Sequence, residues 1–294
     1  MTVLDRPSTA DTRPLVTRPA NRPLMTLAAL MAVTAVVTAA LALVDPVQIT
    51  GRNGWFKPLK FAISISVYAV TLAWLLDRLP ARRQRLGRIA AWVVTVALLI
   101  EIVIIVGAVA AGTTSHFNVS SPLATTLWSV MGTSIAVVWV VTLALAALLW
   151  RAADADAARR LAIRAGLVIG LAGMAVAFLM TSPTAEQLDD FAGVAGAHAV
   201  GAADDGPGLP FLGWSTTGGD LRVPHFVGMH ALQALPLLVL GLEALAGRVP
   251  ALRYPRTRFR IVAVASTGYA VVLVLLTLQA LAGIPVTDPL GFLR

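Results

Sequence analysis

Seven long apolar runs follow one another along the 294-residue chain, each separated from the next by a polar or glycine-rich segment. Each run has the length that an α-helix needs to cross ~30 Å of hydrocarbon, about 20 residues. A transmembrane β-barrel would instead show ~10-residue segments of alternating polarity, and none are present. The pattern therefore predicts an all-α, polytopic transmembrane helix bundle. Its predicted spans are residues 24–44, 57–76, 89–111, 123–149, 165–182, 225–246 and 261–282.

The segments around these runs define the predicted domain organisation. Residues 1–23 carry four arginines among prolines and threonines, a composition typical of a disordered basic tail. We interpret residues 24–282 as one membrane domain that contains a long loop at 183–224, and residues 283–294 as a short tail. The first run is of spanning length rather than the roughly 7–15 residues of a signal-peptide core, which favours a retained helix over a cleaved signal.

The basic residues predict the orientation of the bundle, because cytoplasmic loops of membrane proteins are enriched in Arg and Lys. With the N-terminus inside, 18 of the 23 basic residues fall on the cytoplasmic side, in the tail and in segments 77–88, 151–164 and 247–260. The outer side then holds only Arg52, Lys57, Lys60, Arg222 and Arg294. The sequence thus predicts an N-in, C-out protein with the 183–224 loop outside.

Composition excludes several classes of function. Hydrophobic residues make up 57% of the chain and charged residues 13%, against about 25% charged residues in soluble domains. The net charge of +8 does not indicate nucleic-acid binding, because the basic residues lie in short segments between apolar runs; the expected partner is the lipid bilayer. The absence of cysteine excludes disulfides, thiolate metal sites and cysteine nucleophiles. The last span has no lysine for a retinal Schiff base.

The 183–224 loop is rich in Gly, Pro and Asp. A loop of this length is usually a functional lid or binding loop, and the alternative is a loose tether. Phe211 and Trp214 are costly to leave in water, which favours a folded loop.

All four histidines fall on the predicted outer side. His116 follows the third run, His198 lies in the long loop, and His225 and His230 begin the sixth run. Histidines gathered in this way can bind a metal or haem or relay protons. Their spacing places His225 and His230 about 140° apart on a helix, so they share one ion only if His225 precedes the helix. The alternative is that each imidazole is simply solvated.

Glu101 lies near the middle of the third run. An ionised carboxylate there is unfavourable by at least ~2.5 kcal/mol, so such residues usually face the bundle interior and serve function. The alternative is a neutral glutamic acid that hydrogen-bonds a neighbouring helix. We expect it to face polar groups such as Ser64, Tyr68 and Gln233. Glu243, near the inner end of the sixth run, is interpreted as a structural residue within reach of water or Arg248.

Lys57, Lys60 and Ser64 share one face of the second predicted helix. The two ammonium groups could extend to outer-leaflet headgroups. Alternatively, they form an anion site for a carboxylate, a phosphate or a haem propionate. Their position on the side where basic residues are scarce adds support to the anion site, and both alternatives stay open.

Several motifs carry a resemblance to a known family. They are Trp55-Phe56-Lys57-Pro58-Leu59-Lys60-Phe61, residues Thr113 to Asn118, and the stretch from Asp205 through Trp214 and Gly219-Asp220 to His225 and His230. The chain beyond residue 45 resembles a family of uncharacterised bacterial seven-helix integral membrane proteins. The resemblance implies a multi-pass protein of the bacterial plasma (inner) membrane and brings no function with it.

A second resemblance concerns the long loop alone. Its Gly-rich part, Gly219-Asp220, Arg222 and a histidine entering a helix are similar to haem A synthases, whose histidines ligate haem. Those proteins have eight helices, this chain has seven predicted spans, and the other motifs do not map. The similarity adds support only for haem as a cofactor.

These features lead to two main functional hypotheses. The first is a membrane redox or cofactor protein with an outer-facing site, in which haem b or a divalent metal lies between the third and sixth spans, with a quinone as a further ligand. The second is a proton-coupled transporter or channel in which Glu101 carries the proton. A metal-dependent membrane hydrolase is a third hypothesis, although the histidine pattern of known seven-helix zinc hydrolases does not match. Both main hypotheses use Glu101 as the catalytic group and take ligand-binding residues from His116, His225, His230, Lys57 and Lys60. They predict a small hydrophobic or anionic ligand, and they place His116 near His230.

Overall fold

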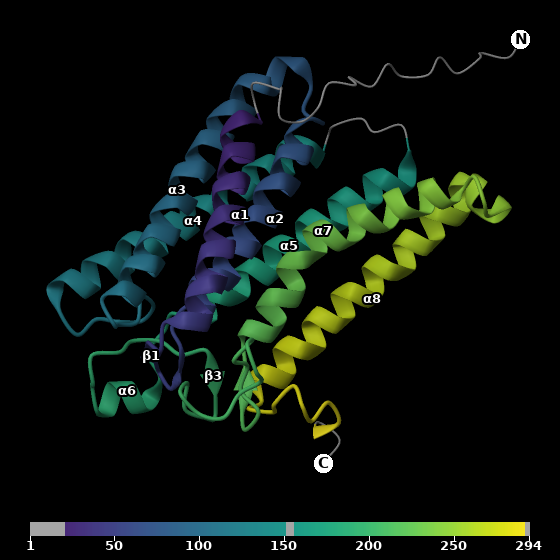
Figure 1. Ribbon diagram of the computed structural model, residues 1–294. Coiled ribbons are helices and arrows are strands. Elements are labelled where there is room, and N and C mark those ends of the chain that lie inside the picture. Colours follow the sequence, from purple (N-terminus) through teal and green to yellow (C-terminus); the bar gives the residue numbers. More distant parts are fainter. Residues whose placement is uncertain (1–20, 151–155, 292–294) are drawn as a thin grey trace, which may run out of the picture.

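The computed structural model describes residues 21–150 and 156–291 of the chain (Figure 1). These residues form eight α-helices, seven of which are long and apolar enough to cross a membrane. The predicted all-α seven-span bundle is therefore confirmed, and the chain is a multi-pass membrane protein. Residues 1–20 of the predicted tail, and Arg294, lie outside the described residues.

The spanning helices match the apolar runs, with some ends extended. They are α1 (Arg22–Val44), α2 (Phe56–Leu76), α3 (Gln84–Ala110), α4 (Pro122–Trp150), α5 (Ala157–Leu179), α7 (Arg222–Leu245) and α8 (Pro255–Leu281). Helix α5 begins well before the predicted residue 165. The reason is a cap, because the Asp156 carboxylate accepts from the backbone N–H groups of Ala158 and Arg159. The helix therefore continues past the apolar run into an arginine-containing turn.

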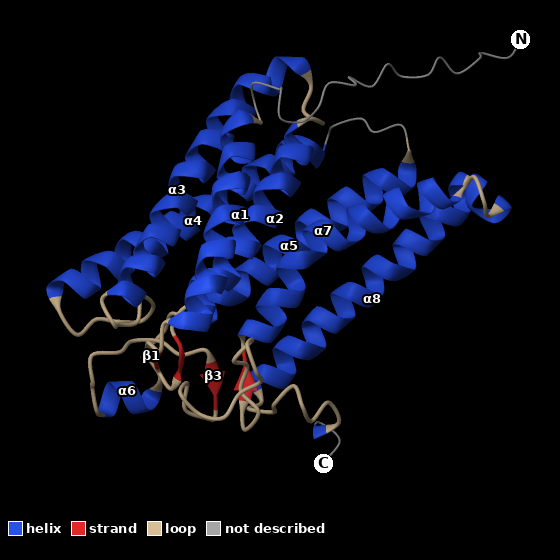
Figure 2. Cartoon of the chain, viewed as in Figure 1, coloured by secondary structure: helices blue, strands red, loops and turns tan. Residues whose placement is uncertain are grey.

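The connections alternate between the two ends of the bundle. One end, called the loop side here, holds residues 45–55, 111–121, 180–221 and 282–291. It contains the short helix α6 (Ala185–Asp189) and every strand assigned in the described chain (Figure 2). These strands are β1 (Gln48–Ile49), β2 (Arg52–Asn53), β3 (Ala199–Val200) and β4 (Gly219–Asp220), which pair antiparallel as β1–β2 and β3–β4. The opposite end carries the 3₁₀ turns Ala81–Arg83 and Pro250–Arg253. The loop side is the side that the charge distribution predicts to be outer.

The buried apolar side chains of the described residues form three clusters. The largest joins α1 to α4 with residues of α5, and a second joins α5, α7 and α8. A third lies towards the loop side and contains Phe117, Met180 and Leu221. Large apolar side chains such as Val33, Leu237 and Val264 remain exposed on the outside of the helices. Such a surface suits a bilayer, where the surrounding solvent is itself apolar.

Helices α5 and α7 cross at glycines. A Cβ atom built on Gly173 would lie 2.3 Å from the carbonyl carbon of Gly228. Gly166 and Gly170 face α7 as well. A Cβ built on Gly166 would lie 3.0 Å from the Ala231 carbonyl oxygen, and one built on Gly170 would lie 3.3 Å from Cβ of Leu232. Small residues at helix contacts let backbones approach closely in membranes. This contact fixes the start of α7, which carries His225 and His230, against α5.

Candidate functional site

Glu101 lies inside α3, close to His116 of the loop that follows this helix. The Glu101 residue is 1% exposed, and its Oε1 lies 3.8 Å from Nε2 of His116. Its other oxygen, Oε2, is buried and has no hydrogen-bond partner among the described residues. A buried polar atom without a partner is costly, and a bound water, a ligand or a functional role can account for it. The predicted intramembrane carboxyl group thus faces protein and one imidazole.

His116 is held by aromatic rings and a hydroxyl group. Its Nδ1 lies 3.1 Å from Oγ of Ser115, and its ring centre lies 5.3 Å from Trp128 and 5.5 Å from Phe61. Burial, with the charges of Lys57 and His198, lowers the pKa of His116 well below its usual value. The imidazole is therefore neutral at pH 7.

Phe117 links His116 to His198. Its ring centre lies 5.2 Å from Trp128 and 4.8 Å from His198. Its backbone is left-handed, with φ of 63°, a conformation that costs about 1–2 kcal/mol in a residue with a side chain. Gly196 lies directly against the ring, because a Cβ there would be 2.6 Å from Cδ1 of Phe117. Surrounding contacts thus hold a strained residue between the two histidines.

His198 is oriented by Asp204. The carboxylate lies 2.7 Å from Nδ1 of His198 and accepts the backbone N–H groups of His198 and Ala199. Burial would raise the pKa of Asp204, but the contact with His198 and these backbone donors outweigh it and lower the pKa to about 2. Burial lowers the pKa of His198, against the effect of Asp204. A neutral His198 then donates from Nδ1 to the carboxylate and keeps Nε2 as an acceptor.

Lys57 supplies a positive charge that acts on this group. It lies in the first turn of α2 and interacts electrostatically with Glu101, His116 and His198. Its ammonium group makes no hydrogen bond with any residue that the structure describes. The site therefore combines a buried carboxyl group, two imidazoles and one cation without a hydrogen-bonded partner.

Three other cations bind one turn of the long loop, residues 206–213, called the 206–213 turn below. Lys60 donates to the carbonyl oxygens of Leu212 at 2.9 Å and Phe211 at 3.2 Å. Arg52 donates to the carbonyl oxygen of Gly206 at 2.8 Å and also to that of Gly213. Arg222 donates to the same Gly213 oxygen at 2.6 Å. Phe211 also packs against Phe56, and Trp214 against Phe226. The long loop is therefore folded onto the bundle, which contradicts a loose tether.

His225 and His230 make separate contacts on α7. Nδ1 of His225 donates to the Gly173 carbonyl at 2.9 Å, because that oxygen can only accept. Nδ1 of His230 lies 3.2 Å from Oε1 of Gln233, whose amide donates to Thr71 at 3.2 Å. His225 therefore contacts α5, whereas His230 bonds Gln233 of its own helix, and within the described chain neither hydrogen-bonds the Glu101 carboxyl group. The predicted proximity of His116 and His230 stays a prediction.

The hydrogen bonds near the two intramembrane glutamates are as follows. Tyr68 bonds Thr142 at 2.6 Å and Gln233 bonds Thr71, so neither hydrogen-bonds Glu101. Glu243 pairs with Arg159 at 2.7 Å and not with Arg248. Helix α5 extends to Ala157 and carries Arg159 along α7, a geometry that the apolar pattern did not predict.

His198 and Asp204 were not predicted as site residues. Their one sequence signal is a histidine followed six positions later by an aspartate within a Gly-rich segment. That spacing has no helical or strand periodicity, so only the folded loop reveals the pair.

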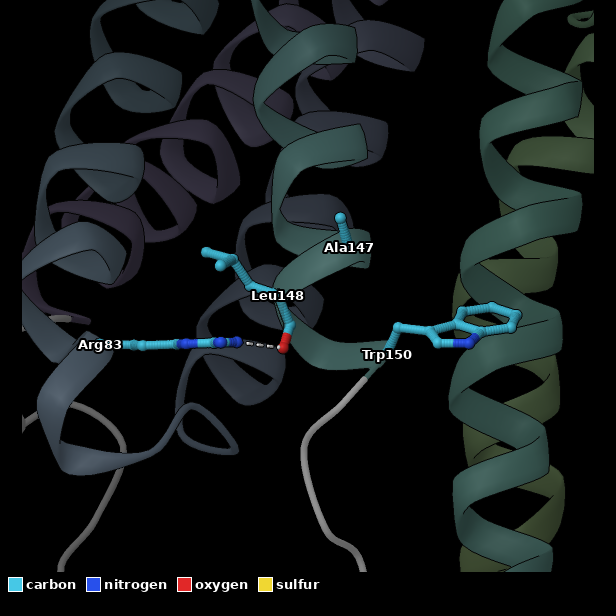
Figure 3. A pocket seen from close by; sticks show the side chains of 4 residues that line it. All are labelled: Arg83, Ala147, Leu148 and Trp150. Carbon is cyan, nitrogen blue, oxygen red and sulfur yellow. Dashed lines mark hydrogen bonds between the residues drawn. The ribbon is translucent and has the colours of Figure 1, made fainter.

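The described residues contain no group of three or more His, Cys, Asp or Glu side chains that could hold a metal ion. A hollow at the opposite end of the bundle is lined by Arg83, Ala147, Leu148 and Trp150 (Figure 3). Arg83 donates there to the Leu148 carbonyl at 2.8 Å. The hollow is not part of the candidate site, which lies on the loop side. Comparison of the chain with family models, curated proteins and solved structures finds no match in any of the three.

Proposed function

We propose that this protein is a proton-coupled membrane protein, in which Glu101 carries the proton and His116 exchanges it with the loop side. The observation that supports the proposal is the contact itself. Among the described residues, a buried carboxyl group with one unpartnered oxygen lies 3.8 Å from Nε2 of a half-buried imidazole. Ionisable residues inside membrane bundles commonly serve as proton relays.

The geometry suits a transfer that is switched by a small movement. A direct proton transfer needs roughly 2.6–3.2 Å between heavy atoms, and the observed separation is 3.8 Å. A shift of less than about 1 Å therefore closes the contact. His116 then accepts the proton on Nε2, and Glu101 becomes a carboxylate beside the Lys57 ammonium group.

His198 is the next acceptor on the loop side. It lies across Phe117 from His116, and the two imidazoles interact electrostatically. The Asp204 carboxylate stabilises a protonated His198. The order Glu101, His116, His198 thus runs from the membrane interior to the loop, and water supplies the remaining step.

Purified protein in liposomes tests the proposal. A membrane potential is imposed, and internal pH is followed with a trapped dye. We expect proton uptake by the unmodified protein and none by Glu101→Gln, because an amide keeps the shape but cannot exchange the proton. The control is Glu243→Gln, which removes a carboxylate of α7 that pairs with Arg159. Full uptake by Glu101→Gln, in folded protein, overturns the proposal.

A cofactor protein is the second candidate function. His225 donates from Nδ1 to a backbone carbonyl, and its Nε2 has no hydrogen-bond partner among the described residues. Metal-binding histidines are oriented in this way by their second nitrogen. Haem b would give the purified protein a Soret band that is lost in His225→Gln. A colourless, metal-free protein with proton uptake favours the first candidate.

A further inference from the structure

Four cations gather on the loop side, where both the charge distribution and the helix dipoles disfavour them. Lys57 and Lys60 lie in the first turns of α2, and Arg222 is the first residue of α7. A helix N-terminus already carries about +0.5 of an elementary charge. Neither helix has an acidic residue in its first turn. The arrangement is unfavourable unless negative charge is supplied.

These cations interact with one another. Lys60 interacts electrostatically with Arg222 and Arg52, and Lys57 with Lys60 and Arg222. Burial and the charge of Arg222 lower the pKa of Arg52, although Asp220, Asp204 and Asp205 act against them. Each cation destabilises the charged form of its neighbours, which a bound anion would relieve.

The nearby carboxylates are already engaged. Asp220 accepts from the side chain and backbone of Arg222 and from the Ser215 backbone. Asp204 is bound by His198 and the adjacent backbone. Of the four cations, Arg222 alone has a hydrogen-bonded carboxylate among the described residues.

The other two bonded cations, Lys60 and Arg52, are satisfied by neutral oxygens. Their hydrogen bonds go to carbonyl groups of the 206–213 turn. Hydrogen bonds from a cation to an ionised acceptor are roughly twice as strong as neutral ones. An anion would therefore compete successfully with these carbonyl oxygens.

We propose that Lys57, Lys60 and Arg52 bind a small organic carboxylate, whose oxygens replace the carbonyl oxygens of the 206–213 turn. The rim of the site favours a carboxylate with an apolar part, because Phe56 and Phe211 meet there with ring centres 5.4 Å apart. The turn acts as a lid that occupies the site until the ligand binds. The inference rests on the proposed function, because this anion would be the species whose binding is coupled to the proton on Glu101.

Calorimetry with the purified full chain tests the site, using benzoate as the probe. Benzyl alcohol has nearly the same shape without the charge, and inorganic phosphate has the charge without the ring. We expect saturable binding of benzoate and no comparable binding of the other two. Equal binding of benzyl alcohol would show an apolar site only, and tighter binding of phosphate would overturn the carboxylate assignment.

Lys57→Gln is the decisive variant, because Lys57 makes no hydrogen bond to the described chain and its loss leaves the turn in place. We expect its affinity for benzoate to fall about tenfold, which corresponds to about 1.4 kcal/mol. The matched control is Arg248→Gln, an exposed charge at the other end of α7. Equal affinities in Lys57→Gln and the unmodified protein overturn the site.

Hydrogen exchange supplies a second measurement. Benzoate should raise exchange within the 206–213 turn of the unmodified protein, because its carbonyl groups are released from Lys60 and Arg52. An unchanged or slower exchange in this turn contradicts the replacement.

Glu101→Gln should retain benzoate binding and lose proton uptake. If it keeps proton uptake while Lys57→Gln loses benzoate, the proton proposal fails and the carboxylate site stands.

Discussion

Nε2 of His116 lies 3.8 Å from Oε1 of Glu101, so a residue of the loop side touches a carboxyl group that belongs to a membrane span. This separation is too long for a direct hydrogen bond. The contact can therefore be made or broken by a small displacement of residues 111–121. The proposed proton transfer from Glu101 therefore depends on the position of the loop side.

The predicted topology can be tested with single cysteines, because the chain has none of its own. Leu188 of α6 is 71% exposed on the loop side, and Tyr254 is 67% exposed at the opposite end. In intact cells, a membrane-impermeant maleimide should label Leu188→Cys and not Tyr254→Cys. Both should react after the cells are broken. The reverse pattern would place the candidate site on the cytoplasmic side.

The crossing of α5 and α7 predicts a stability effect. In Gly173→Ala the new methyl group meets the Gly228 backbone at 2.3 Å, which no side-chain movement relieves. We expect a loss of about 1–3 kcal/mol, the usual cost of overpacking. The measurement is thermal unfolding in detergent.

Gly241→Ala is the control for this crossing. It lies on the same helix as Gly228, and a Cβ there meets nothing within 4 Å. Its melting temperature should equal or exceed that of the unmodified protein. Equal melting of both alanine variants would refute the close contact.

The spans were predictable because one physical constraint dominates them. Backbone groups in hydrocarbon must bond internally, so an apolar run of sufficient length becomes a helix. The ends were less predictable. Ala157 begins α5 because of the Asp156 cap, which is a local hydrogen bond and leaves no hydropathy signal.

The site was predictable in part. Glu101 and Lys57 stand out because charge is expensive in a span, and His116 because it follows the same span closely. His198 and Asp204 depend on the fold of the long loop, which is built from turns and contacts between distant segments. Lys60 was expected to hold an anion or reach the headgroups, and instead it binds loop carbonyls 151 and 152 residues away.

The His198–Asp204 pair predicts that the loop side is destabilised by acid. The folded pKa of His198 lies below its usual value, so the unfolded chain takes up the proton first as pH falls below about 6.5. The stabilisation from Asp204, whose folded pKa is about 2, is present at neutral pH. It is lost as pH falls from about 4 towards 2. Both effects lower stability in acid, by up to about 1.4 kcal/mol per pH unit for each group.

Hydrogen exchange of residues 197–221 between pH 8 and pH 5, corrected for intrinsic rates, measures the His198 part of this effect. Protection should fall below pH 6.5 in the unmodified protein. His198→Gln should flatten the profile, because the group that titrates has been removed. Lys57 and Arg222 also act on His198, so their charges must be kept in that variant. A flat profile in the unmodified protein would contradict the lowered pKa.

The last prediction concerns the two residues of the central contact together. If His116 passes the proton of Glu101, the two side chains act as one unit, and their variants should not be additive. His116→Gln should slow proton uptake by about 10²–10⁴-fold, the usual contribution of a positioned acid or base. Glu101→Gln should abolish uptake, and the double variant should be no slower than Glu101→Gln. A purely structural His116 predicts a different result, because its replacement would lower the melting temperature and leave uptake per folded molecule unchanged. Uptake rates in liposomes, normalised to folded protein, therefore separate a relay from a packing role. An unchanged rate in His116→Gln would remove this histidine from the proton path while leaving Glu101 to be tested on its own.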